Sequence, residues 1–92
     1  MSRCRVCVVY RGQVQGVGFR YTARRLATGY ELAGLVRNLL DGRVELIAEG
    51  DRAELEAFQL AIRESGLGPL IRQEETTWQA AEGNLRGFQI VG

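Results

Sequence analysis

The amino-acid sequence predicts an α+β fold in which two helices cover one face of an antiparallel sheet. The prediction depends first on length, because 92 residues suffice for one domain. It depends also on pattern: segments rich in β-branched and aromatic residues alternate with segments whose apolar residues recur every three or four positions. With 46 % hydrophobic and 25 % charged residues, the composition is that of an ordinary globular protein.

The first half of the chain predicts strand, helix, strand and strand. Residues 5–11 are β-branched and aromatic enough for a strand, and three glycines interrupt the pattern within residues 12–18. Two further strands are expected at residues 32–38 and 43–49, separated by the turn signal Asp41-Gly42. Between the first strand and the second, one apolar stripe at helical spacing is made of Phe19, Ala23, Leu26, Ala27 and Tyr30.

The second half of the chain predicts a helix and two more strands. Asp51 and Glu54 have the spacing of a capping box at a helix start. Residues 71–78 alternate mostly polar side chains, as expected of a strand at a sheet edge, and a short strand is expected at 87–91. The order βαββαβ plus a short C-terminal strand is that of the ferredoxin-like, split-βαβ arrangement, so we expect a single domain over residues 1–92. The apolar positions of the second helix are Leu55, Phe58 and Ile62.

The charge and the residue inventory exclude several classes of function. The chain carries 12 basic and 11 acidic residues, a net charge of +1. Domains that bind nucleic acid usually have a basic excess, because phosphate neutralisation supplies most of the affinity, so a small anion is the better candidate ligand and we expect no nucleic-acid partner. The chain contains neither histidine nor lysine, which excludes histidine-activated nucleophiles and any mechanism that requires a lysine.

Two cysteines have C-x-x-C spacing, but we expect them to be structural. Cys4 and Cys7 lie in a predicted strand, where residues three apart point to opposite faces and are poorly placed to bridge or to share a metal. With no other Cys and no His, a zinc site lacks ligands, so we expect no metal and no cofactor. The sequence shows no membrane-spanning apolar stretch and no signal-peptide pattern, which predicts a cytoplasmic protein without a membrane partner.

The glycine-rich segment at residues 12–18 is the first candidate site. It joins a strand to a helix, so its end presents unpaired helix N–H groups and the positive end of the helix dipole. Gly16 and Gly18 permit positive φ angles, so successive N–H groups can turn inward to bind an anion. Arg20 can add a bidentate contact to phosphate oxygens. Nucleotide-binding glycine motifs do not match, and the alternative that the glycines only permit a tight connection stays open here.

Asn38 is the second candidate. In a split βαβ unit the first and second strands run parallel, so their C-terminal ends lie at the same end of the sheet. Asn38 ends the second predicted strand, which brings a side chain that can both donate and accept a hydrogen bond to the mouth of the anion site. Asparagine also suits the start of a turn, and that alternative stays open at this point.

Two motifs resemble those of the acylphosphatase family. Residues 12–20 match the signature G-x-V-Q-G-V-x-[FM]-R at every specified position. Residues 34–50 follow the spacing of a second family motif, G-aromatic-x-[KRQ]-N-x-x-x-G-x-V-x-x-x-x-x-G. Leu35 stands where the family usually has an aromatic residue, and Tyr10 where it usually has an aliphatic one. We expect both differences to alter packing rather than chemistry, and the resemblance extends over nearly the whole chain.

The resemblance implies a metal-independent enzyme that hydrolyses the carboxyl-phosphate bond of small acylphosphates to a carboxylate and phosphate. It implies that Arg20 holds the phosphoryl oxygens, that Asn38 orients the attacking water, and that a phosphate oxygen of the substrate takes the proton of that water. We expect a monomer whose site also accepts inorganic phosphate or sulfate. The phosphate-binding residues are then Gln15, Gly16, Val17, Gly18, Phe19 and Arg20.

Two alternatives compete with this interpretation. RNA-recognition domains share the element order, but they stack bases on aromatic residues of the middle strands, whereas residues 43–49 contain no aromatic residue and two acidic ones. The second alternative is a non-catalytic phosphate- or anion-binding module, or an acylphosphatase-like module that acts inside a larger maturation enzyme for carbamoyl phosphate. Such an enzyme would carry zinc-finger and transferase domains, which these 92 residues do not contain.

Overall fold

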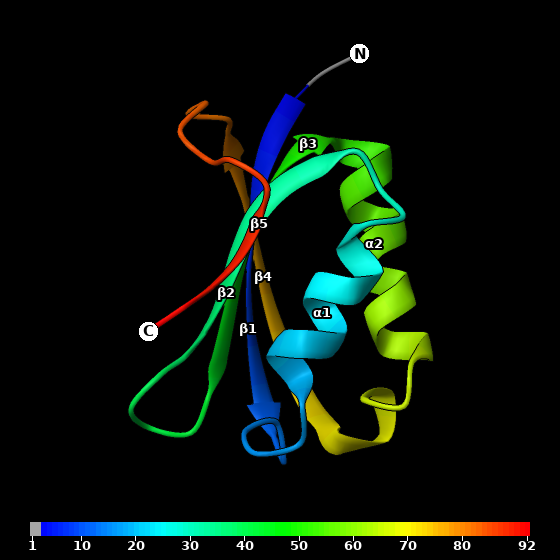
Figure 1. Cartoon of the computed structure of the whole chain (residues 1–92), viewed down its shortest axis with the longest axis vertical. Helices are drawn as coiled ribbons and strands as arrows, with labels where there is room; N and C mark the ends of the chain where they lie inside the picture. Colours follow the sequence, from blue (N-terminus) through cyan, green and yellow to red (C-terminus); the bar gives the residue numbers. More distant parts are fainter. Residues whose placement is uncertain (1–2) are drawn as a thin grey trace.

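The computed structural model describes residues 3–92 and shows one sheet covered on one face by two helices (Figure 1). The five strands lie in the order β4-β1-β3-β2-β5. The predicted α+β fold and its βαββαβ order are therefore confirmed. In chain order the elements are β1 (Arg3–Gly12), α1 (Phe19–Ala27), β2 (Leu32–Asn38), β3 (Val44–Asp51), α2 (Arg52–Glu64), the 3₁₀ turn η1 (Gly68–Leu70), β4 (Ile71–Ala80) and β5 (Phe88–Val91).

The sheet is mixed rather than wholly antiparallel. The pairs β1–β3, β1–β4 and β2–β3 are antiparallel, but β5 pairs parallel to β2, with Gly34 opposite Phe88. Because β4 runs antiparallel to β1, it also runs antiparallel to β2. The connection at residues 81–87 reverses the chain after β4, so β5 returns in the direction of β2. The prediction of an antiparallel sheet is wrong for this last pair, whereas β4 does lie at an edge as predicted.

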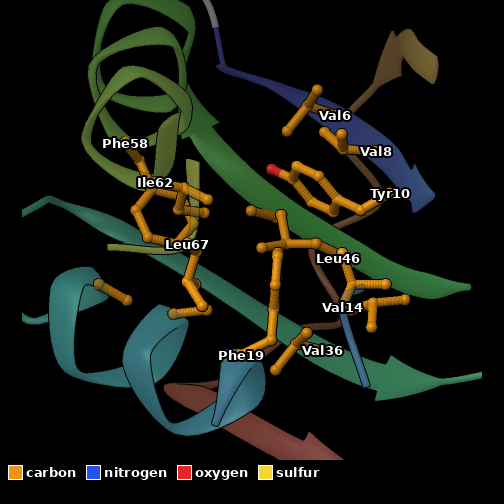
Figure 2. Packing of buried hydrophobic residues seen from close by; sticks show 14 of the residues in the cluster. Val6, Val8, Tyr10, Val14, Phe19, Val36, Leu46, Phe58, Ile62 and Leu67 are labelled. Atoms are coloured by element: carbon orange, nitrogen blue, oxygen red, sulfur yellow. The ribbon is translucent and has the colours of Figure 1, made fainter. Parts of the chain in front are cut away.

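The hydrophobic core lies between the sheet and the helices (Figure 2). Alternate residues of β1 point toward the helices, and Tyr10 is fully buried there with its ring centroid 4.8 Å from that of Phe19. In the predicted stripe of α1, Phe19, Ala23 and Ala27 are buried, while Leu26 and Tyr30 are partly buried. The core therefore joins the end of β1 to the start of α1, the two segments that flank the glycine-rich loop.

The predicted capping box does not form. Asp51 is the residue before α2, but its side chain makes no capping hydrogen bond. The Glu54 carboxylate accepts the backbone N–H of Glu31 at 2.8 Å. This donor lies in the connection between α1 and β2, so Glu54 ties α2 to that connection instead of reaching back to the start of its own helix.

The two cysteines lie on opposite faces of β1, as predicted, and both are free. Cys4 packs against the core. The Cys7 thiol donates to the Glu45 carboxylate at 3.8 Å on the face without helices. Burial and the adjacent Glu45 raise the pKa of Cys7, which lowers its thiolate fraction and with it its reactivity.

On the helix-free face a buried carboxylate holds the connection that precedes β5. Glu49 is 1 % exposed and accepts a hydrogen bond from Arg5 Nε at 2.6 Å. It also accepts the backbone N–H groups of Glu82 and Gly83 at 2.7 and 3.0 Å, while Arg5 donates to Asn84 Oδ1 at 2.7 Å. Burial opposes ionisation of Glu49, but these hydrogen bonds outweigh it and lower the pKa of the carboxyl group.

Glu49→Gln should lower the free energy of unfolding by up to about 3 to 5 kcal/mol, because Arg5 would keep a buried charge and lose its nearer carboxylate, with only the exposed Glu82 left at 3.8 Å. The pKa of Glu49 is lower in the folded than in the unfolded protein, where it is about 4.3. The stabilisation is therefore present above pH 4.3 and is lost as the pH falls through the folded pKa. Urea denaturation at pH 7 and at pH 3 measures both effects.

The difference in the free energy of unfolding between wild type and Glu49→Gln should accordingly be smaller at pH 3 than at pH 7. Glu56→Gln is the control, because Glu56 makes only an exposed pair with Arg52 and its loss should cost less than about 0.5 kcal/mol. A wild-type-to-variant difference that is the same at both pH values would contradict the role of the Glu49 carboxylate.

Tyr10→Phe should stabilise the protein. The Tyr10 hydroxyl is buried and has no hydrogen-bond partner among residues 3–92. A buried polar group in that state costs about 1 to 3 kcal/mol, so we expect a gain in this range in the free energy of unfolding by urea denaturation. Tyr21→Phe removes an exposed hydroxyl and should change stability by less than about 0.5 kcal/mol. A Tyr10→Phe variant no more stable than wild type would contradict the structure at this point.

Candidate active site

The candidate residues come together at one end of the sheet. Because β1 and β2 both run antiparallel to β3, they are parallel to each other, and their C-terminal ends lie beside the start of α1 (Figure 1). A cavity of about 190 Å³ opens there. Arg20 and Asn38, the two residues predicted to be catalytic, both line it. The full lining is Val14, Gly16, Gly18, Phe19, Arg20, Tyr21 and Asn38.

The glycine-rich loop adopts the backbone conformation that an anion site requires. Gly16 and Gly18 have φ angles of 77° and 80°, and Gly18 is the residue immediately before α1. The first hydrogen bond of the helix runs from the Thr22 N–H to the Gly18 carbonyl at 3.0 Å. The N–H groups of residues 19–21 therefore have no helical acceptor and form a row of free donors at the cavity.

The start of the loop is anchored to η1. Gly12 has a φ of +135°, and a Cβ atom there would lie within van der Waals overlap of the Leu70 carbonyl oxygen. The next residue, Gln13, donates its backbone N–H to the same carbonyl at 2.9 Å. A side chain at position 12 would therefore force the loop away from its support.

The side chain of Gln15 connects the glycine-rich loop to the β2–β3 turn. Gln15 Nε2 donates to the carbonyl oxygens of Leu39 and Arg43 at 2.7 and 2.9 Å. These residues enclose the turn that follows Asn38, and the Leu39 N–H closes it by donating to Arg43 at 2.8 Å. Sequence analysis had assigned Gln15 only to phosphate binding. The bridging role could have been anticipated from one signal, a long amide side chain in a loop expected beside the turn.

Asn38 presents an uncommitted carboxamide. Its Oδ1 is buried and has no hydrogen-bond partner within residues 3–92. The preceding Arg37 pairs with Glu45 at 2.6 Å on the helix-free face, so strand alternation turns Asn38 toward the helices. The turn itself is stabilised by Asp41, whose carboxylate accepts the Arg43 N–H at 3.2 Å. The Asn38 side chain is therefore not needed for the turn, and an unpaired buried amide is typical of a position for water or ligand.

Arg20 supplies positive charge to the cavity. It lies in the first turn of α1, is half-buried, and has no carboxylate within ion-pair distance in the part of the chain that the structure describes. Many other arginines are paired: Arg5 with Glu49, for example, and Arg63 with Glu74 at 2.9 Å. An arginine free of carboxylates at a helix N-terminus suits a tetrahedral anion, which can accept two parallel N–H bonds.

The two remaining predicted loop residues differ, because Phe19 lines the cavity and Val17 does not. The Phe19 side chain is buried in the core, and the backbone N–H of Phe19 lies at the start of α1. Val17 is 41 % exposed and does not line the cavity. Sequence analysis missed Tyr21, which lines the cavity and is 63 % exposed. The available signal was its place directly after Arg20 in the first helical turn.

Residues 3–92 also lack two features that would point to other functions. No three Cys, Asp or Glu side chains gather there in an arrangement that could bind a metal ion. Neither helix in this range has the length and apolar character needed to span a bilayer.

Comparison with known proteins decides the family. The sequence model of the acylphosphatase family matches residues 6–90. This chain belongs to the acylphosphatase family. An acylphosphatase from Thermococcus kodakarensis is 41 % identical over the full length of both chains. The crystal structure of acylphosphatase from Bacillus subtilis superposes with a TM-score of 0.88 and 34 % identity, over 97 % of this chain and 99 % of that one.

The acylphosphatase fold also recurs within a longer protein. The crystal structure of full-length HypF in its phosphate- and nucleotide-bound form matches 99 % of this chain but only 12 % of its own length, with a TM-score of 0.83 and 27 % identity. The full-length relatives are named acylphosphatases, so the prediction of an acylphosphatase enzyme, made from the two motifs, is confirmed.

Arg20→Ala should weaken the binding of inorganic phosphate at least about 10-fold, because it removes charge-assisted hydrogen bonds worth about 1.5 to 3 kcal/mol. Isothermal titration calorimetry with inorganic phosphate at pH 7 measures the change. Arg25→Ala is the matched control, since Arg25 is an exposed arginine of the same helix that does not line the cavity. Equal phosphate affinity in wild type and Arg20→Ala would contradict an anion site at Arg20.

Proposed function

We propose that this acylphosphatase cleaves the carboxyl-phosphate bond of small acylphosphates, with Arg20 holding the phosphate and Asn38 orienting the attacking water. One observation carries the assignment of residues: the unpaired Arg20 guanidinium and the uncommitted Asn38 carboxamide line the same cavity as the glycine-rich loop. Family membership supplies the class of reaction, and the geometry supports the role of each residue.

The phosphoryl group binds in the glycine-rich loop. The backbone N–H groups of residues 15–20 donate to its oxygens, and the Arg20 guanidinium adds a bidentate contact. In phosphoryl transfer the developing charge lies on the equatorial oxygens, so the catalytic demand is positioning and electrostatic stabilisation. Fixed amide donors at a helix N-terminus, together with one guanidinium, meet that demand without rearrangement.

Asn38 orients the attacking water in line with the bond that breaks. The water oxygen forms a bond to phosphorus, the bond between phosphorus and the carboxyl oxygen breaks, and the carboxylate leaves with the electron pair. No carboxylate lines the cavity, and the chain has no histidine, so a phosphoryl oxygen of the substrate takes the proton of the water. The Gln15 bridge keeps the carboxamide and the loop at a fixed separation during this step.

The same lining supports a reaction without a metal ion. Mg²⁺ is usually held in proteins by one or two carboxylates, and the cavity has none, so Arg20 and the amides neutralise the phosphate. That the active form is a monomer stays a prediction. Inorganic phosphate and sulfate are expected to occupy the phosphoryl position. The cytoplasmic location stays a prediction.

The proposed reaction is tested by following benzoyl phosphate hydrolysis in the ultraviolet with EDTA present. Arg20→Ala should lower turnover on the order of 10² to 10³-fold, because charge-assisted donors that act in the transition state are lost. Arg20→Lys should also be poor, since a point charge does not replace a bidentate contact. Asn38→Ala should lower kcat with a smaller effect on KM, because this residue acts on water rather than on substrate.

Arg25→Ala again serves as the control and should retain full turnover. A defect of Asn38→Ala confined to KM would overturn its role toward water, and turnover abolished by EDTA would overturn the metal-free reaction. A wild-type protein that binds phosphate but leaves benzoyl phosphate intact would instead identify a non-catalytic anion-binding module.

A further inference from the structure

Exposed apolar side chains gather at the end of the molecule that holds the cavity. Within residues 3–92 four large apolar residues are exposed, and three of them, Val17, Tyr21 and Leu40, belong to segments that meet at this end (Figure 1). These segments are the glycine-rich loop, the first turn of α1 and the β2–β3 turn, the first and last of which Gln15 connects. Single exposed apolar residues are ordinary, but their concentration beside a cavity indicates a surface that meets a ligand.

Tyr21 is the member of this group that forms part of the cavity wall. Side chains of a helix lean toward its N-terminus, so the Tyr21 ring covers the surface on the side of the glycine-rich loop. Gly16 and Gly18, which also line the cavity, carry no side chain, and a Cβ atom built at either would meet no other atom within 4 Å. An aromatic wall therefore stands beside open space next to the phosphoryl position.

Arg24 stacks against the Tyr21 ring. Its guanidinium carbon lies 5.4 Å from the ring centroid, and the two residues are three apart on the same helical face. A ring that is already stacked loses less rotational freedom when a ligand packs on it, which favours binding.

The polarity of the walls divides the cavity between the two parts of a substrate. The loop amides, Arg20 and Asn38 are the polar groups, and they suit the phosphoryl end. The acyl group must then extend away from them, toward the exposed side where Tyr21 forms the wall. An aromatic acyl group is flat and long enough to stack on the tyrosine ring, whereas an acetyl or carbamoyl group has no aromatic surface to offer it.

We propose that Tyr21 forms an acyl-group subsite that favours acylphosphates with a planar aromatic acyl group over those with a small acyl group. The subsite rests on the proposed function, because it assumes that Arg20 and the loop hold the phosphoryl end. Tyr21 acts here by contact with the substrate and takes no part in the transfer of the phosphoryl group.

The test compares kcat/KM for benzoyl phosphate and acetyl phosphate in wild type, Tyr21→Ala, Tyr21→Phe and Leu60→Ala. In Tyr21→Ala the ratio of benzoyl to acetyl phosphate should fall about 2- to 12-fold, the range that an aromatic pair supplies. Tyr21→Phe keeps the ring and should keep the ratio. Leu60 is the fourth exposed apolar residue but lies on α2 outside the cavity, so Leu60→Ala should leave both values unchanged.

A ratio that Tyr21→Ala leaves unchanged, or that Leu60→Ala lowers equally, would overturn the subsite. Titration with the non-hydrolysable benzoylphosphonate and acetylphosphonate measures the binding affinity at the subsite without turnover. Wild type should bind the benzoyl compound more tightly, and Tyr21→Ala should lose that preference. Equal affinities in wild type would overturn the subsite, whereas a retained preference in a protein without turnover would support it and overturn only the proposed reaction.

Discussion

The site depends on the separation between two loops, and one side chain sets it. The Gln15 carboxamide donates to the carbonyl oxygens of Leu39 and Arg43 in the β2–β3 turn and so ties the glycine-rich loop to the end of β2. Gln15 belongs to the loop that precedes Arg20, and the turn that it contacts directly follows Asn38. In-line attack requires water and phosphorus to be held within a narrow range of distance and angle, and a hydrogen-bonded bridge between loops of a small domain achieves this without a closing lid.

The hydrophobic core also supports the position of the glycine-rich loop. Tyr10 and Phe19 pack ring against ring at the two ends of the glycine-rich loop, which fixes the loop by its flanks (Figure 2). Tyr10 differs from the residue usual in the family at this place, and its burial as a core side chain agrees with a change of packing. Leu35, the other difference, lies opposite Ile47 on the helix-free face of the sheet, remote from the face where Asn38 lines the cavity.

The distribution of charge separates the site from the rest of the surface. Acidic residues pair with arginines elsewhere: Glu49 with Arg5 beneath the C-terminal connection, and Glu45 with Arg37 on the helix-free face. None of the residues among 3–92 that line the cavity carries a carboxylate. The positive end of α1 and the Arg20 guanidinium therefore act there without a competing internal anion, which favours a ligand that brings its own negative charge.

Features that depend on residues near one another in the chain were determined by the sequence alone. The apolar stripes of both helices, the alternation of the strands and the glycine-rich loop before Arg20 follow from spacing, and strand direction in a split βαβ unit was enough to expect Asn38 at the same end. The tertiary structure decided the contacts between distant segments: the Gln15 bridge, the Glu54 bond to Glu31 that replaces the capping box, the Glu49 contacts and the parallel pairing of β5. The sequence does not show which partner a polar side chain will meet. Several unpaired donors and acceptors become available only once the elements are packed, and the side chain pairs with the one that lies nearest.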